Sequence, residues 1–364
     1  MKKYSVIPVV FLIVTLLLGG GIVLATNAGK VEDTTPLLVK DIVPTEIVKK
    51  EEVLPKTPQS YILPQKEFVG QTFNNCGPAA LSMTYSLLGI FVSQAELAER
   101  LRPFNNPAGG VDDKSVFPEE FIEEAQERGF LAMQGPNGAT ELLEQLIAQD
   151  IPVIVRTWLN PIEDIGHFRV VRGYDREAQI FTVDDSYNGP NLQMSYAEFD
   201  SLWQPFNYSY IVVYPKEKKE IVERIIGEDM DPNIAWANAL KRAEEESASS
   251  INAYPAFNIV TAKYHLGDYK GAVEAYEKIS SNLPPRMFWY QLEPLRAYLA
   301  LGNYEKVFEM TDSVLMNGNQ AFSELYEMRG DAYKAQGNTI AAQAEYDKAI
   351  LYNKNLAKKI QNIN

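Results

Sequence analysis

The sequence is poor in cysteine and histidine, the two side chains that most often bind transition metals. It has one cysteine, Cys76, and two histidines, His167 and His265, among 364 residues. A single cysteine excludes an internal disulfide and a cysteine-rich metal site, and two histidines are too few for a zinc cluster. We therefore expect neither a metal nor a cofactor.

Basic charge is also scarce. The chain has 34 Lys and Arg against 48 Asp and Glu, which gives a net charge of −14 and a pI of about 4.8. Binding to the phosphates of nucleic acids needs a basic surface, so we expect no nucleic-acid partner. Hydrophobic residues make up 46% of the chain, which is enough to bury sizeable cores.

Near the N-terminus, charge is missing over a long run. Lys2 and Lys3 precede residues 4–29, which contain no charged side chain. As a helix rising about 1.5 Å per residue, residues 4–26 would extend roughly 34 Å, enough to cross a bilayer core. Lysines before the apolar run favour a cytoplasmic N-terminus and an extracytoplasmic body. Residues 1–29 are thus predicted to be a transmembrane signal anchor in the cell membrane, or a cleaved signal peptide of a secreted protein.

The next residues change in pattern twice. Residues 30–60 combine four prolines with Lys and Glu, which is typical of an extended linker. Residues 61–215 show helical periodicity first and strand-like runs afterwards. Helices are expected over 76–88, from Ser93 to Leu101, from Pro118 towards Gly129, over 140–149 and after Ser195, and strands over 152–158, 167–174, 180–184 and 208–214. Helices followed by antiparallel strands indicate an α+β domain.

The last part of the chain repeats itself. Gly267, Gly302 and Gly337 are 35 residues apart, and each is followed five residues later by a small apolar residue. A glycine that ends a helix, with small residues that let helix pairs pack closely, is typical of the tetratricopeptide repeat, which this region resembles. Residues 230–360 are thus predicted to form an all-α tetratricopeptide-repeat solenoid that binds a protein partner or substrate.

Two segments contain the residue types needed for nucleophilic catalysis. Cys76 begins a predicted helix, where backbone N–H groups and the helix dipole favour a thiolate. His167 begins a predicted strand after Gly166, which permits the close approach of another segment, and it could serve as the base. A buried structural cysteine and a packing histidine are the simpler alternatives. His265 lies in a repeat helix, and we expect it to be structural.

Two further side chains would complete such a site. Asp184 and Asp185 point to opposite faces if both lie on a strand, so only one of them could orient the imidazole. Gln71, five residues before Cys76, could donate its amide to the oxyanion of a tetrahedral intermediate. The alternatives are a turn-forming aspartate and an ordinary polar loop residue.

A family resemblance rests on four motifs. They are Gln71, Asn-Cys-Gly-Pro-Ala-Ala at 75–80, Gly-His-Phe at 166–168 and Val-Asp-Asp at 183–185. Residues 61–214 thereby resemble the papain-like peptidases of cysteine peptidase family thirty-nine. The resemblance implies a papain-like fold.

The same resemblance implies a role for each residue. Cys76 would be the nucleophile, His167 the base and acid, Asp185 the orienter and Gln71 the oxyanion donor. In the family a proline follows this aspartate, whereas Ser186 stands there in this chain.

These features predict a membrane-anchored, extracytoplasmic cysteine peptidase of the bacterial cell envelope that cleaves protein or peptide substrates. Family members that trim double-glycine leaders are normally fused to a transporter and act on the cytoplasmic side, so that substrate fits less well. Two alternatives stay open. One is a catalytically inactive papain-like scaffold of the envelope, and the other is a transglutaminase or cell-wall amidase, which also uses Cys, His and an acid.

Overall fold

The structure is a computed structural model that describes residues 56–104 and 114–363. The predicted signal anchor at 1–29 and most of the predicted linker at 30–60 lie outside the described residues. Within the described part of the chain, no helix is both long enough and apolar enough to cross a membrane. The transmembrane helix therefore stays a prediction.

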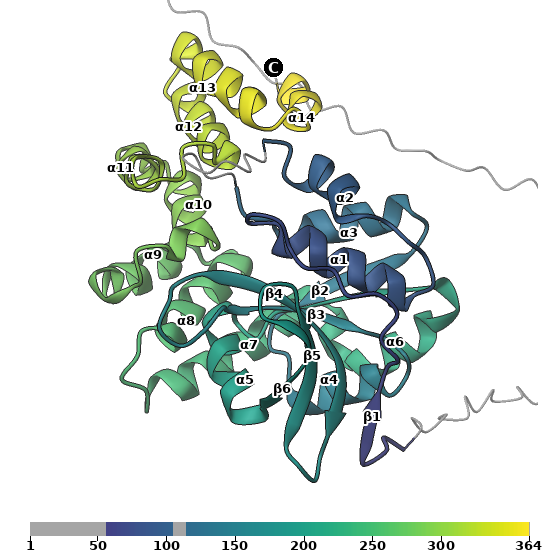
Figure 1. Cartoon of the computed structure of the whole chain (residues 1–364). Coiled ribbons are helices and arrows are strands. Elements are labelled where there is room, and N and C mark those ends of the chain that lie inside the picture. Colours follow the sequence, from purple (N-terminus) through teal and green to yellow (C-terminus); the bar gives the residue numbers. More distant parts are fainter. Residues whose placement is uncertain (1–55, 105–113, 364) are drawn as a thin grey trace, which may run out of the picture. The chain divides into compact units, whose positions relative to one another are not determined.

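A seven-stranded antiparallel sheet runs in the order β2-β7-β3-β4-β5-β6, with β1 paired to β4 (Figure 1). Valine, isoleucine and aromatic residues dominate β3 and β7, because branched and planar side chains pack well on a pleated surface. The strands are β1 (Ser60–Ile62), β2 (Leu131–Gly135), β3 (Val153–Trp158), β4 (Gly166–Asp175), β5 (Ile180–Asp185), β6 (Gly189–Ser195) and β7 (Tyr210–Tyr214).

The register of β4 decides which side chains meet. Asp185, the last residue of β5, lies opposite Arg169 of β4. Successive side chains alternate between the two faces of a strand, so His167 and Arg169 share one face while Phe168 takes the other. The end of β5 is thereby brought beside the start of β4, on the face that carries His167.

Helices cover both faces of the sheet (Figure 1). On one face, α1 (Cys76–Leu87), α2 (Gln94–Leu101) and α3 (Pro118–Glu127) share a hydrophobic core with β4. On the other face, α4 (Thr140–Ile147) and α5 (Tyr196–Trp203) contribute to a second core. Full burial of one such apolar side chain stabilises the fold by about 1.5–3 kcal/mol. The two cores together therefore hold β4 firmly in place.

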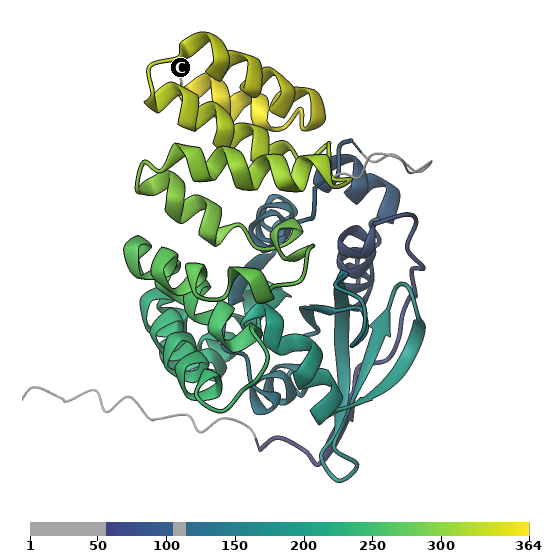
Figure 2. The same ribbon diagram turned by 90° about the vertical axis from the view of Figure 1, so that its left-hand side faces the viewer.

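After β7 the chain continues as helices, several of which stack in succession away from the sheet (Figure 2). They are α6 (Lys219–Ile226), α7 (Pro232–Ser247), α8 (Tyr254–His265), α9 (Tyr269–Glu277), α10 (Glu293–Ala300), α11 (Tyr304–Met316), α12 (Ser323–Ala335), α13 (Thr339–Tyr352) and α14 (Leu356–Ile363). Short 3₁₀ turns lie at Gln204–Phe206, Lys216–Lys218, Gly227–Met230, Ser280–Asn282 and Met287–Trp289.

The three aligned glycines end helices, as the repeat predicts. Gly267, Gly302 and Gly337 have φ of +78°, +72° and +77° just after α8, α10 and α12, a left-handed conformation that glycine adopts without steric cost. In each copy the next residue caps the following helix by accepting a hydrogen bond from the backbone N–H three positions on. These caps are Asp268, Asn303 and Asn338.

The antiparallel sheet with its helices fits the predicted papain-like domain, and the C-terminal region is helical. The tetratricopeptide-repeat assignment and the domain boundaries at 61–215 and 230–360 stay predictions. The described residues belong to one compact unit. One hydrophobic core joins the sheet to the helical region through Phe257, Met287 and Tyr290.

The sequence pattern did not predict β1, β2, β6 or α6. β2 has the sequence Leu-Ala-Met-Gln-Gly, which has little strand preference of its own. It becomes a strand because all five of its residues pair with β7. Such pairing depends on the tertiary fold and leaves no local periodicity.

Candidate active site

Cys76 occupies the first position of α1, where the sequence predicts a helix to begin. The preceding Asn75 holds the cap position, but its side chain makes no bond to the helix. Instead, its Nδ2 donates to Thr72 Oγ1 at 2.7 Å and its Oδ1 accepts from Arg102 at 3.2 Å. The loop before the thiol is thus fixed by side-chain bonds. The thiol lies at the positive end of the helix dipole, which favours its ionised form.

The surroundings of Cys76 lower the pKa of its thiol. Burial alone would raise it, but a hydrogen bond with His167 and the charge of that ring act in the opposite direction. A backbone hydrogen bond at Phe168 and the charge of Arg102 add to the lowering. A lower pKa increases the fraction of thiolate, which is the nucleophilic form, at neutral pH.

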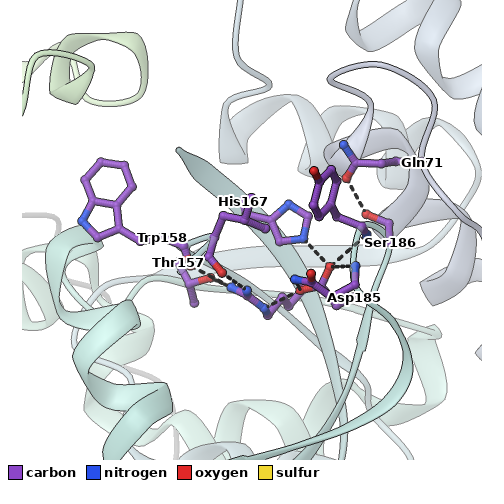
Figure 3. Close-up of polar contacts among 10 residues, drawn as sticks. Gln71, Thr157, Trp158, His167, Asp185 and Ser186 are labelled. Atoms are coloured by element: carbon purple, nitrogen blue, oxygen red, sulfur yellow. Dashed lines mark hydrogen bonds and ion pairs between the residues drawn. The ribbon is translucent and has the colours of Figure 1, made fainter. Parts of the chain in front are cut away.

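His167 lies near the start of β4 and is only 3% exposed. Its Nε2 bonds to Asp185 Oδ1 at 2.8 Å (Figure 3), so Nδ1 is the ring nitrogen that stays available to the Cys76 thiol. Burial lowers the pKa of His167, but the bonds to Asp185 and Cys76 raise it overall. A lowered thiol pKa beside a raised imidazole pKa favours a thiolate–imidazolium pair.

The geometry distinguishes the two neighbouring aspartates. Asp185 faces His167 and also accepts from the backbone N–H groups of Tyr187 and Asn188, both at 2.9 Å. Burial would raise the pKa of Asp185, but His167 and the other partners hold it well below its usual value. Asp184 points to the opposite face, where it accepts from Arg172 Nε at 2.8 Å. Asp185 is therefore the carboxylate that can orient the imidazole.

Arg169 belongs to the same network, and sequence reasoning did not single it out. Its Nε donates to Asp185 Oδ2 at 2.9 Å, and its other nitrogens donate to the carbonyls of Trp158 and Leu159 at 2.9 and 2.7 Å (Figure 3). A fully bonded buried guanidinium of this kind holds β3, β4 and β5 in one arrangement. The sequence did contain one signal for Arg169: it is a charged residue two positions after His167, on the same face of a buried strand.

Gln71 is tied to the residue that replaces the expected proline. Its backbone N–H donates to the Ser186 carbonyl at 2.9 Å, and the Ser186 hydroxyl donates to Gln71 Oε1 at 2.9 Å. Because the amide oxygen is engaged by Ser186, the amide nitrogen is directed away from it (Figure 3). Ser186 thus connects the loop of Gln71 to the end of β5 by two bonds, of which a proline could supply only the carbonyl one.

A pocket of about 180 Å³ lies at this network. Cys76, His167 and Gln71 all line it, so the structure brings three of the four predicted site residues to one cavity. Asp185 supports the ring of His167 from behind and is fully buried. Trp289 and Tyr290, from the helical region, form part of the pocket wall.

His265 lies apart from this pocket, in α8, where it stacks on Trp236 with 3.9 Å between the ring centroids. Among residues 56–104 and 114–363, no group of three or more His, Cys, Asp or Glu side chains is placed to hold a metal ion.

Comparison with known proteins gives one family match. Residues 59–211 match the model of the Peptidase_C39 like family. This C39-like domain contains Gln71, Cys76, His167 and Asp185, whereas the helices from α6 onwards lie outside it. A crystal structure of a Bacillus anthracis protein, described provisionally as a C39-like peptidase, is similar over 44% of this chain and 99% of that chain, with 16% identity and a TM-score of 0.37. Comparison with curated proteins gives no match.

Proposed function

We propose that the chain is a cysteine peptidase in which Cys76, His167 and Asp185 act together. One observation carries the proposal: the buried His167 ring bonds to Asp185 and lines the same pocket as the Cys76 thiol, which lies at the start of α1. Acyl transfer by a thiolate needs these three groups at one site: a nucleophile, a base and a residue that orients the base. The C39-like domain supports a function of this class.

The proposed reaction is acyl transfer in two steps. The Cys76 thiolate attacks a peptide carbonyl, and the oxyanion accepts hydrogen bonds from the Gln71 amide and the Cys76 backbone N–H. The imidazolium of His167 gives its proton to the departing amine, which leaves a thioester. Water then attacks the thioester, and His167 takes a proton from that water, so the acid is released and the thiolate returns. Asp185 keeps the ring in place throughout.

The proposal extends to the setting of the enzyme. The apolar segment at 1–29 would anchor the chain in the cell membrane with its body outside the cytoplasm, and the helices after residue 230 would bind a protein partner or substrate. Both statements rest on the sequence patterns alone.

A direct test uses the single thiol of the chain. The full chain, kept in mild detergent, is treated with iodoacetamide at neutral pH, and the modification of Cys76 is followed by mass spectrometry. Fast modification that slows in His167→Ala is expected, because the imidazolium is what stabilises the thiolate. Hydrolysis of a peptide library by the same samples should be lost in Cys76→Ala, with a fall of about a thousandfold or more.

Two results would contradict the proposal. Hydrolysis that persists in Cys76→Ala would assign the activity to another group or to a contaminant. Slow modification that His167→Ala leaves unchanged, with no hydrolysis, would favour the inactive scaffold. Incubation with peptidoglycan fragments and with amine donors separates a peptidase from an amidase or a transglutaminase.

A further inference from the structure

A short segment between α9 and α10 reaches the rim of the candidate active site. This segment, residues 286–291, contains the 3₁₀ turn Met287–Trp289. At its start, the backbone N–H and the guanidinium of Arg286 both bond to Asp164, at 2.8 and 3.0 Å. At its end, Gln291 Nε2 donates to the Pro205 carbonyl at 2.8 Å. Both ends are therefore fastened to the sheet domain.

Between these ends, Tyr290 packs against the strand that carries the histidine. Its carbonyl accepts from the buried Arg156 at 2.8 Å, and its ring lies on Gly166. A Cβ atom at Gly166 would come within 2.8 Å of that ring, so only glycine fits there without displacing the tyrosine. The glycine before His167 thus permits the approach of a segment more than 120 positions later in the chain.

Trp289 is the neighbour of this anchored tyrosine, and it is only half buried. It lines the same pocket as Cys76 and His167, and Leu159 and Ile165 line that pocket as well. The pocket measures about 180 Å³, which compares with the roughly 150 Å³ of an apolar cavity that accepts benzene in another protein. One aromatic or large aliphatic side chain would fill it.

The cations that line the pocket are engaged within the protein, whereas a carboxylate of its lining, Glu163, is exposed and accepts from Asn160. Arg102 donates to the Phe73 carbonyl at 3.2 Å, and Lys114 is paired with Glu120 and Glu324. Because these cations already bond to groups of the protein, they would attract a charged substrate weakly. The apolar wall therefore favours an apolar side chain.

We infer that residues 286–291 form one wall of the substrate pocket and that Trp289 determines specificity for a large apolar side chain of a peptide substrate. This inference rests on the proposed peptidase function. It also makes the active site composite, because the C39-like domain ends at residue 211 and the wall comes from the helical region. Burial of an apolar side chain against Trp289 would supply the preference.

The test uses peptidyl acyloxymethyl ketones, which alkylate an active thiol. Pairs of tripeptide probes carry either phenylalanine or alanine at one position, and the three positions are tested in turn. The second-order rate of Cys76 modification is measured for the full chain, for Trp289→Ala and for Trp236→Ala. Trp236 is the matched control, since it is half buried in the helical region but lines a different pocket.

At one position we expect a preference for phenylalanine of about tenfold or more, the size that an apolar pocket gives. Trp289→Ala should bring the ratio close to one, Trp289→Leu should leave part of it, and Trp236→Ala should keep it. Thermal unfolding curves of the Trp289 variants should show a folded protein at the assay temperature, and the iodoacetamide rate of Trp236→Ala should match that of the unaltered chain.

A ratio close to one in the unaltered chain, or a preference that survives Trp289→Ala, would overturn the inference while leaving the peptidase proposal in place. Failure of every probe, together with slow and His167-independent iodoacetamide modification, would instead overturn the proposed function and the inference with it.

Discussion

The two histidines of the chain lie in different regions, and each has a carboxylate beside it. His167, in the sheet, holds Asp185 at 2.8 Å and is 3% exposed. His265, in the helical region, lies 3.6 Å from Glu293, and its side chain is 27% exposed. Its ring also stacks face to face on Trp236, at an interplanar angle of 6°. The same pair of groups is thus built into two different environments.

The difference shows what a carboxylate–histidine pair needs in order to act as a base. The ring of His167 shares a pocket with the Cys76 thiol, which lies at the N-terminus of a helix, and both residues belong to buried elements. The chain has no second cysteine to place beside His265, and Trp236 covers one face of that ring. A partner carboxylate is therefore not enough, and the third group decides the chemistry.

The sharpest way to test this comparison is the same change at both carboxylates. Asp185→Asn keeps an acceptor for Tyr187 and Asn188 but removes the charge that holds the imidazolium, so peptide hydrolysis should fall by about 10²–10⁴-fold. Glu293→Gln should leave hydrolysis within about twofold, because that pair touches no reacting atom. The measurement is kcat/KM for one cleaved peptide.

Circular dichroism of both variants is the control for folding. Equal losses in the two variants would show that the pairs are equivalent and would contradict the distinction between them.

The pH dependence of thiol modification gives a smaller but more specific difference between His167 and His265. In the unaltered chain, the thiolate fraction stays high at pH values below the ordinary thiol range, because the pKa of Cys76 is lowered. His167→Ala removes the largest of the groups that lower it, while burial, which raises the pKa, stays, so the midpoint should move to higher pH. Once the midpoint lies above neutral pH, each further rise of about one on the pH scale reduces the thiolate fraction at neutral pH roughly tenfold.

His265→Ala should leave this profile unchanged, and it serves as the matched histidine deletion. A profile that moves equally in both variants would point to a general loosening of the fold. Iodoacetamide rates, measured in steps across the neutral range, supply the curves.

The sequence allowed much of this site to be predicted, because its signals are local. The first turn of a helix places Cys76, and a strand that begins after Gly166 places His167. The choice between Asp184 and Asp185 needed the register of β4 and β5, since alternation alone leaves both faces possible. The bond of Ser186 to Gln71 also depends on two loops that meet only in the folded chain.

The wall formed by residues 286–291 could not have been predicted from local patterns. Its anchors join Asp164 to Arg286 and Arg156 to Tyr290, pairs that are separated by more than a hundred positions. Gly166 was the one visible hint, because a glycine beside a predicted strand indicates close approach of another segment without naming it. Likewise, the residues of β2 favour neither a helix nor a strand, and β2 becomes a strand only because it pairs with β7.

The smallest expected effect concerns the contribution of the His265–Glu293 pair to the stability of the fold. Burial would raise the pKa of Glu293, but His265 and Arg296 hold it below its usual value. A depressed carboxyl pKa gives stability that is present above the unfolded value, about 4.3, and that is lost as the pH falls through the folded value. Because the pair is long and partly exposed, Glu293→Gln should lower the free energy of unfolding by only about 0–1 kcal/mol.

Urea unfolding of both chains over roughly pH 3 to 6 checks this, since the ionisation of the carboxyl group lies in that window. The difference between the two chains should shrink as the pH falls and disappear at its acid end. A loss of several kcal/mol would mean that the Glu293–His265 pair is a buried structural centre comparable to the Asp185 network. A constant difference across the window would mean that the glutamine disturbs packing around Trp236 rather than removing a charge. Only the first result would mean that the two histidines differ less in their electrostatic role than their geometry indicates.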